Sequence, residues 1–285
     1  MEILNEKYNF PTNVSLILGF FDGIHAGHKD VINNTSLAEK VIVTFSKSPA
    51  EYFSTKFEYI YPRRYNYELL AELGVKYVFE QDFASIVNLS ASEYLDFIIK
   101  KFQPKSITTG FNHTFGANRS GNPEFLLQNQ NNFEYLCTPA TKIGDKIVCS
   151  TLIKDFISKG DLNNVKSFLS RNFSFESTVI KGEKLGRKLG FPTANMKYPE
   201  QIVKLPYGVY KVKVLDRPAI LNWGVKPTFG SEPLLEVHIP NYNEDLYGKV
   251  LRVEIFEKIR DERKFLNIDD LKNQIEKDVQ KCLEL

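Results

Sequence analysis

The pattern of expected strands and helices changes near residue 150, and this change limits the possible folds more than any other feature of the 285-residue sequence. Before it, short runs rich in β-branched residues, such as "VSLILGF" and "VIVTF", are typical of strands. Three later runs have the same character: "KYVFEQ", "KSITTGF" and "FEYLCTP". Stretches with helical spacing separate these runs. Such strand–helix alternation predicts an α/β domain in which helices cover a parallel sheet.

Two of the expected helices carry clear end signals. "RRYNYELLAELG" places leucines at helical spacing and ends at Gly74, and "SASEYLDFIIKKF" opens with the capping-box pair Ser90 and Glu93. The last segment of this half, "KIGDKIV", predicts a hairpin at the edge of the sheet.

The second half is mostly β after two short helices, which Gly160 and Asp161 separate in "STLIKDFISKGDLNNVKSFLS". Five strand-like runs follow between Gly and Pro turns: "FESTVIKG", "GVYKVKVL", "PAILNWGV", "LLEVHI" and "LRVEIFEKI". They predict a small antiparallel barrel. A closing helix is expected to bury one face, formed by Leu271, Ile275, Val279 and Cys282. We therefore expect domains at 1–155 and 173–285, with a helical linker at 156–172.

The composition excludes several classes of protein. The 37 basic and 35 acidic residues nearly cancel, so we expect no nucleic-acid partner. No run approaches the roughly 20 apolar residues of a membrane span, and the polar N-terminus does not resemble a signal peptide. The three cysteines lack metal-binding spacing, which indicates reduced thiols and a cytoplasmic location. We expect a monomer or weak oligomer.

The segment "LGFFDGIHAGHKDVI" places His25 and His28 directly after an expected strand. Gly19 and Gly23 permit a tight turn, and the helix that begins near Gly27 offers free N–H groups to an anion. Two imidazoles beside that helix end could donate hydrogen bonds to a phosphate. Metal ligation by the pair and a turn without a function are the alternative interpretations.

"GFFDGIHAGH" resembles the signature of the HxGH nucleotidylyltransferases, which transfer AMP from ATP and release pyrophosphate. "CSTLIK" at 149–154 resembles their second motif, and "GFNHTFGANRSG" at 110–121 resembles a stretch of the bacterial bifunctional riboflavin kinase/FMN adenylyltransferases. The resemblance implies a Rossmann-like domain with catalytic His25 and His28. The residues that it implies for binding ATP and flavin are Gly19, Phe20, Asp22, Gly23, Asn112, Thr114, Ser150, Thr151 and Lys154.

"GEKLGRKLGFPTANM" at 182–196 resembles the riboflavin kinase signature. Its glycines let the backbone approach phosphates, and an extended chain places Thr193 and Asn195 on one side, where their oxygens suit Mg²⁺. The resemblance implies a C-terminal β-barrel kinase domain with a closing helix. The residues that it implies for binding ATP and flavin are Gly182, Gly186, Arg187, Gly190, Pro192, Thr193, Asn195, Arg260 and Glu262.

By the same resemblance Glu236, in "LLEVHI", is the catalytic base of the kinase, held on a strand inside the barrel. Taken alone, it is more typical of a glutamate on the outer face of an antiparallel sheet. "LPYGVY" and "NWGVKPTFG" follow in the family's order, and "IRDERKF" at 259–265 resembles its flavin-contacting segment. The resemblance spans about residues 15 to 280.

Several positions depart from the family pattern, and most of them lie in the first half. Lys47 and Ser48 replace two residues of the usual "PHP", and His113 stands where an aromatic ring is expected. Cys149 replaces a common Ser, and Lys154 and Lys226 stand where Arg is frequent. The resemblance implies an enzyme that makes FMN from riboflavin and ATP, and FAD from FMN and ATP, with Mg²⁺. The alternatives are a riboflavin kinase with a degenerate first domain, and a flavin-binding protein without activity.

Overall fold

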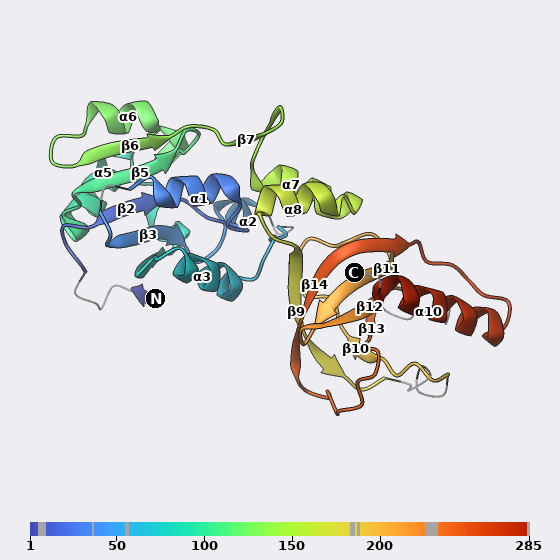
Figure 1. Cartoon of the computed structure of the whole chain (residues 1–285). Helices are drawn as coiled ribbons and strands as arrows, with labels where there is room; N and C mark the ends of the chain where they lie inside the picture. Colours follow the sequence, from blue (N-terminus) through green and yellow to red (C-terminus); the bar gives the residue numbers. More distant parts are fainter. Residues whose placement is uncertain are drawn as a thin grey trace. The chain divides into compact units, whose positions relative to one another are not determined.

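The computed structural model describes residues 1–4, 10–35, 37–54, 57–182, 186, 189–225 and 233–283. Its contacts divide the chain into two compact units, Met1–Ser150 and Thr151–Leu285, each described by itself below (Figure 1). The domain and linker bounds expected from the sequence, 1–155, 156–172 and 173–285, stay a prediction.

The first unit contains the predicted parallel sheet, with strand order β1-β4-β3-β2-β5-β6. Its strands are β1 (Glu2–Leu4), β2 (Ser15–Leu18), β3 (Lys40–Phe45), β4 (Tyr77–Gln81), β5 (Ser106–Gly110) and β6 (Glu134–Thr138). After β2 the chain adds β3 and β4 on one side of that strand. It then returns and adds β5 and β6 on the other side of β2. The carboxyl ends of β2 and β5 therefore form a switch point, where such sheets bind ligands.

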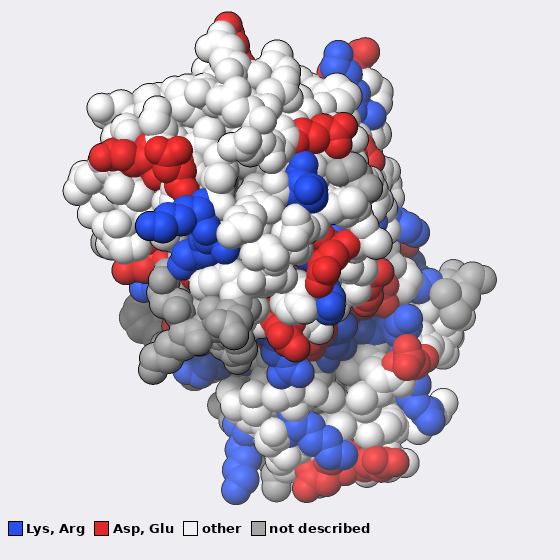
Figure 2. Space-filling model, turned by 90° about the vertical axis from the view of Figure 1, so that its left-hand side faces the viewer, with Lys and Arg blue, Asp and Glu red and all other residues white. Residues whose placement is uncertain are grey.

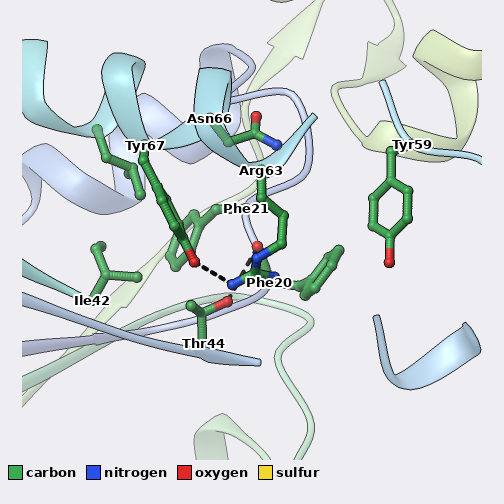
Figure 3. Close-up of a pocket in the computed structure, with 9 residues that line it drawn as sticks. Phe20, Phe21, Ile42, Thr44, Tyr59, Arg63, Asn66 and Tyr67 are labelled. Carbon is green, nitrogen blue, oxygen red and sulfur yellow. Dashed lines mark hydrogen bonds between the residues drawn. The ribbon is translucent and has the colours of Figure 1, made fainter. Parts of the chain in front are cut away.

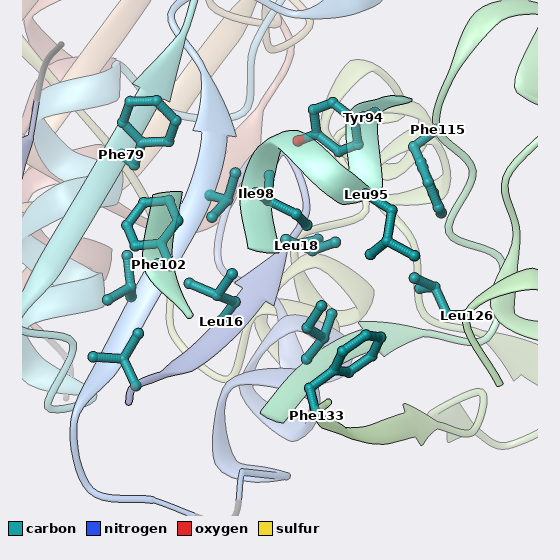
Figure 4. Packing of buried hydrophobic residues seen from close by; sticks show 14 of the residues in the cluster. Leu16, Leu18, Phe79, Tyr94, Leu95, Ile98, Phe102, Phe115, Leu126 and Phe133 are labelled. Carbon is teal, nitrogen blue, oxygen red and sulfur yellow. The ribbon is translucent and has the colours of Figure 1, made fainter. Parts of the chain in front are cut away.

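Helices cover both faces of this sheet. They are α1 (Ala26–Asn33), α2 (Pro49–Phe53), α3 (Arg63–Glu72), α4 (Phe83–Ile86), α5 (Ala91–Phe102), η1 (Ala117–Arg119) and α6 (Pro123–Gln128). Figure 4 shows the core under α5, where Leu95 and Ile98 meet Leu16 and Leu18 of β2. The predicted capping box of α5 is present, because Ser90 Oγ accepts from the Glu93 N–H at 3.2 Å.

The predicted hairpin consists of β7 (Lys142–Ile143) and β8 (Lys146–Ile147), with Gly144 at φ +58° in its turn. Its expected place at the edge of the parallel sheet is wrong. The two strands form a sheet of their own, because each is only two residues long and pairs with the other.

The second unit begins at Thr151, within α7 (Ser150–Lys159), and continues with α8 (Leu162–Leu169). Gly160 at φ +73° ends the first helix, and the Asp161 carboxylate caps the second, as the sequence predicts. The predicted barrel follows as a closed antiparallel sheet of order β10-β13-β12-β11-β14-β9. Its strands are β9 (Phe173–Ile180), β10 (Ala194–Met196), β11 (Gly208–Val214), β12 (Arg217–Gly224), β13 (Leu234–His238) and β14 (Val250–Arg260).

The closing helix α10 (Ile268–Leu283) packs on the outer face of the barrel. Val279 and Cys282, from the predicted apolar face, contact Val209 of β11 and Ile220 of β12. Asp278 on the same helix is buried as well, which the apolar pattern does not indicate. No helix in the described residues is both long and apolar enough to cross a membrane. In Figure 2 acidic and basic side chains lie interspersed on the face in view.

Candidate active sites

The loop that follows β2 has an unusual backbone. Phe21 and Ile24 adopt φ values of +60° and +41°, which cost free energy for residues with a bulky or β-branched side chain, and Gly23 lies at +89°. Two buried hydrogen bonds hold this shape: the Ile60 N–H donates to Asp22 Oδ1 at 2.9 Å, and the Gly23 N–H donates to Asn66 Oδ1 at 3.0 Å. Of the predicted residues, Asp22 and Gly23 therefore shape the loop and do not line its cavity.

This loop brings the two predicted histidines together at the start of α1. His25 is the N-cap residue, and its Nδ1 accepts from the His28 N–H at 3.1 Å, so a neutral His25 ring carries its proton on Nε2. The two rings stack with centroids 3.5 Å apart and an interplanar angle of 13°. Burial, together with the neighbouring His25 ring, holds the pKa of His28 well below its usual value. His28 is thus a neutral hydrogen-bonding group at pH 7.

A cavity of about 300 Å³ opens beside this pair at the switch point of the sheet. The predicted residues that line it are Gly19, Phe20, His25, His28, Asn112, Thr114 and Ser150. The Ser150 hydroxyl also donates to the carbonyl of Asp22 at 2.9 Å, which ties the second motif to the first. Within the described residues no third His, Cys, Asp or Glu joins the histidines in a possible metal cluster. Thr151 and Lys154 follow in α7, in the second unit, and their roles stay predictions.

His113 is a lining residue that the sequence marks only as a departure. Its ring stacks on Phe115 with centroids 5.8 Å apart, and its Nε2 is buried without a hydrogen-bond partner among the described residues. Burial lowers the pKa of His113 to about 4. The imidazole therefore occupies an aromatic position as a neutral ring, and the cavity gains no charge from it.

In the barrel, Glu236 lies on β13 directly across from Asn195 of β10 and Asn222 of β12. Neighbours paired in this way share one face of a sheet, with Cβ atoms about 5 Å apart. We call these three residues, Asn195, Glu236 and Asn222, the polar row. Leu235 and Val237 are fully buried in the interior. Because side chains alternate along β13, Glu236 points to the outer face, where it is half-buried. The prediction that it lies inside the barrel is therefore wrong.

The predicted magnesium ligands lie at one end of the polar row. Asn195 Oδ1 is buried and has no hydrogen-bond partner among the described residues, which is unusual for a polar atom. Two glycines lie close to the ligands. A Cβ on Gly182 would lie 2.4 Å from Asn195 Nδ2, and one on Gly186 would lie 3.2 Å from Thr193 Oγ1. An amide and a hydroxyl oxygen beside backbone that approaches this closely fit a hard cation with phosphate ligands.

The segment that carries these ligands is fixed from both sides. The Phe191 N–H donates to the Gly186 carbonyl at 2.8 Å, and His238 Nδ1 lies 2.8 Å from the Pro192 carbonyl oxygen. Gly190 adopts φ +91° in the turn before them. Predicted Arg187, and the part of "NWGVKPTFG" that begins at Lys226, lie outside the described residues.

Comparisons with known proteins match both halves of the chain to described families. The family described as FAD synthetase matches residues 7–152, and the family described as riboflavin kinase matches residues 169–285. The chain is 32% identical to the bifunctional riboflavin kinase/FMN adenylyltransferase of Escherichia coli K12 over 92% of its length and 90% of the relative's. It is 30% identical to the protein of that name from Bacillus subtilis, over 94% and 91%. The chain belongs to this bifunctional family.

A solved structure from Streptococcus pneumoniae, described as a macrolide-efflux protein, has the same fold. It is 28% identical to the chain, with a TM-score of 0.90 over 98% of this chain and 97% of that one.

The segment in which Lys47 and Ser48 replace two residues of the expected "PHP" leads into the short helix α2. Ser48 caps α2 by accepting from the Ala50 N–H at 3.2 Å, and its own N–H donates to the Tyr59 hydroxyl at 3.2 Å. Beside it lies a small cavity of about 20 Å³, lined in part by Phe20, Arg63 and Tyr67 (Figure 3). The Arg63 guanidinium donates to the Tyr67 hydroxyl, and also to the Phe45 carbonyl and Glu80. This space holds about one water molecule.

The two remaining residues that the family resemblance implies are Arg260, the last residue of β14, and Glu262, just after it. Arg260 forms an ion pair with the buried Asp278 of α10, with an N–O distance of 2.8 Å. Glu262 lies against β12, because a Cβ on Gly224 would be only 1.7 Å from Glu262 Oε1. The structure thus gives Arg260 a partner within the protein, and the binding roles of both residues stay predictions.

Proposed function

We propose that the chain catalyses two linked reactions, as the names of its curated relatives state for those proteins. The barrel transfers the γ-phosphoryl group of ATP to riboflavin and yields FMN and ADP. The first unit transfers AMP from ATP to FMN and yields FAD and pyrophosphate. The observation that carries this proposal is that one chain holds both the stacked histidines in a cavity at the switch point and Glu236 directly across from Asn195.

In the kinase reaction Glu236 acts as the general base. Its carboxylate takes the proton of the terminal ribityl hydroxyl while that oxygen forms a bond to the γ-phosphorus, and the bond to the β-phosphate oxygen breaks. Thr193 and Asn195 would hold Mg²⁺, which neutralises phosphate charge when bound. The register of β10, β12 and β13 fixes the carboxylate beside Asn195, so little movement is needed before reaction.

In the adenylyltransferase reaction an oxygen of the FMN phosphate attacks the α-phosphorus of ATP, and pyrophosphate leaves. Negative charge grows on the phosphate oxygens during this step. Nε2–H of His25 and the neutral ring of His28 supply hydrogen bonds beside the N-terminus of α1, which favours anions. The stacked pair is held before substrate binds, so the donors need no reorganisation when the charge develops.

The test is a chromatographic time course of the full chain with riboflavin, ATP and Mg²⁺, run with and without oxygen. We expect FMN to rise and then to give way to FAD. FMN that accumulates without FAD under both conditions would support the kinase-only alternative, which the altered "PHP" segment favours. Flavin binding without any turnover would support the non-enzymatic alternative and contradict both reactions.

We also propose the cytoplasm as the place of action, which the free thiols of Cys137, Cys149 and Cys282 support. Riboflavin, FMN and ATP are the proposed small-molecule partners. The expectations of a monomer or weak oligomer and of no nucleic-acid partner stay predictions.

A further inference from the structure

The pair formed by Arg260 and Asp278 is one of the most completely bonded contacts in the barrel unit. Arg260 Nε lies 3.0 Å and 3.2 Å from the two carboxylate oxygens of Asp278, and a terminal nitrogen of Arg260 lies 2.8 Å from one of them. Gln274 Nε2 donates to the same carboxylate at 2.7 Å. The Asp278 side chain is 3% exposed. This geometry fixes the orientation of the guanidinium plane, because the contact is made at more than one point.

Arg260 also lies in register with the polar row. On the neighbouring strand it pairs with Val209 of β11. Val209 pairs in turn with Asn222 of β12, which pairs with Glu236 of β13. The contact with Asp278 therefore holds a residue on the same outer face as the proposed catalytic base.

The chain that follows Arg260 is held from two directions. Arg260 donates to the Asp261 carbonyl at 3.1 Å, and Lys258 pairs with the Asp261 carboxylate at 2.6 Å. Glu262 then packs against the backbone of Gly224 at the end of β12. Residues 261 and 262 thus fold back over the barrel, near the polar row, and Arg260 is the link between this turn and α10.

The helix does not depend on the ion pair to attach to the barrel. Val279 and Cys282 already bury apolar side chains against Val209 and Ile220. A buried ion pair is often no more stabilising than apolar residues of the same volume. The charge at Asp278 is therefore better explained by what it does to Arg260 than by the stability of α10.

We propose that Asp278 is a positioning residue for the riboflavin kinase reaction, acting through Arg260 to hold the turn at residues 261 and 262 where riboflavin binds. The proposal rests on the kinase function proposed above. It assigns to α10 a part in substrate binding, although Asp278 itself is buried and does not touch substrate.

The test is Asp278→Asn in the full chain, which keeps the shape of the side chain and removes its charge. We expect the KM for riboflavin to rise about tenfold, because riboflavin binds more weakly. The value of kcat should stay within about twofold of the wild type, because the base is unchanged. Formation of FAD from added FMN, which uses the other unit, should not change. Val279→Ala is the matched control, since it weakens the packing of α10 and leaves Arg260 bonded.

Two further variants decide the result if Asp278→Asn does not fold. Arg260→Lys keeps the charge but loses the planar fork, and Gly224→Ala displaces Glu262 from the opposite side. Both should raise the KM for riboflavin. A wild-type KM in folded Asp278→Asn, or an equal rise in Val279→Ala, would overturn the proposal. If the wild type makes no FMN, the kinase function itself fails, which is a different outcome.

Discussion

The cavity of the first unit and the polar row of the barrel hold their candidate catalytic side chains in different ways. His25 and His28 follow a strand, on a loop and the first turn of a helix, and their placement depends on backbone angles such as φ +41° at Ile24. Glu236 lies on β13 and Asn195 on β10, and their placement depends on the pairing register of these two strands. Residues around the loop site can be replaced while the loop keeps its backbone conformation. The barrel site tolerates no change of strand register, because a shift of one residue turns every side chain to the other face.

This difference explains where the departures from the family pattern lie. Ser48 and His113 belong to the first unit, and both are accommodated locally, by a helix cap and by an aromatic stack. In the described part of the barrel, the residues of the polar row and Thr193 follow the motif pattern that the sequence resemblance implies. The predictions below test whether the two sites are as independent as this comparison implies.

The largest expected effect is on the loop site. In the double variant His25→Ala, His28→Ala we expect the rate of FAD formation from FMN to fall at least about 1000-fold, because both hydrogen-bonding rings at the phosphates are lost. The rate of FMN formation should stay at the wild-type value, measured in the same preparation. A wild-type rate of FAD formation would remove the histidines from the mechanism, and a parallel loss of kinase activity would contradict the independence of the two sites.

The corresponding change in the barrel is Glu236→Gln, which keeps hydrogen-bonding capacity and removes the base. We expect kcat for FMN formation to fall about 100- to 1000-fold, with FAD formation from FMN unchanged. Glu257→Gln, on an exposed position of β14, is the matched control and should behave like the wild type. An unaltered kinase rate in Glu236→Gln would show that another group accepts the proton.

The sequence predicts the architecture of both units because strand and helix signals are local. The caps at Ser90 and Asp161 and the stops at Gly74 and Gly160 fall where their residue types require them. Contacts between distant segments carry no such signal. The pairing of Asn222 with Glu236 depends on register between two strands, and the burial of Asp278 on an otherwise apolar helix face depends on a partner 18 residues away.

The residue types around His25 also do not predict all of the positive φ angles found there. Gly23 marks a tight turn, but nothing in the residue types of Phe21 and Ile24 predicts a left-handed backbone. Asp22 and Asn66 supply hydrogen bonds that help to hold the loop in this conformation. The sequence therefore predicts the two histidines that the structure brings together, and it does not indicate the supports that place them.

A smaller effect should separate the metal requirements of the two sites. In Asn195→Ala we expect the Mg²⁺ concentration for half-maximal FMN formation to rise between about 10- and 100-fold, because the buried amide oxygen is lost. The Mg²⁺ dependence of FAD formation should not change. The measurement is a pair of Mg²⁺ titrations at saturating ATP. An unchanged kinase titration would exclude Asn195 as a ligand.

The smallest predicted effect concerns stability, and it should again divide the chain into its two units. The pKa of His113 is about 4 in the folded chain and about 6.5 in the unfolded chain, so the unfolded chain takes up a proton first as the pH falls. Stability is then lost from about pH 6.5 downward, by about 1 to 2 kcal/mol at pH 5. The lowered pKa of His28 acts in the same direction.

His113→Phe introduces the aromatic residue that the family motif implies at this position and removes one of these protonation sites. We expect the loss of stability of the first unit between pH 7 and pH 5 to be about 1 to 2 kcal/mol smaller than in the wild type, as measured by hydrogen exchange of the β5 amides. The single tryptophan, Trp223, is buried in the barrel, so its fluorescence reports the other unit and serves as the control. The unfolding transition of the barrel unit, followed by this fluorescence, should be the same in the wild type and in His113→Phe at each pH. If the variant and the wild type lose equal stability in the first unit, His113 is protonated in the folded chain at pH 5, and its neutral aromatic role in the cavity is excluded.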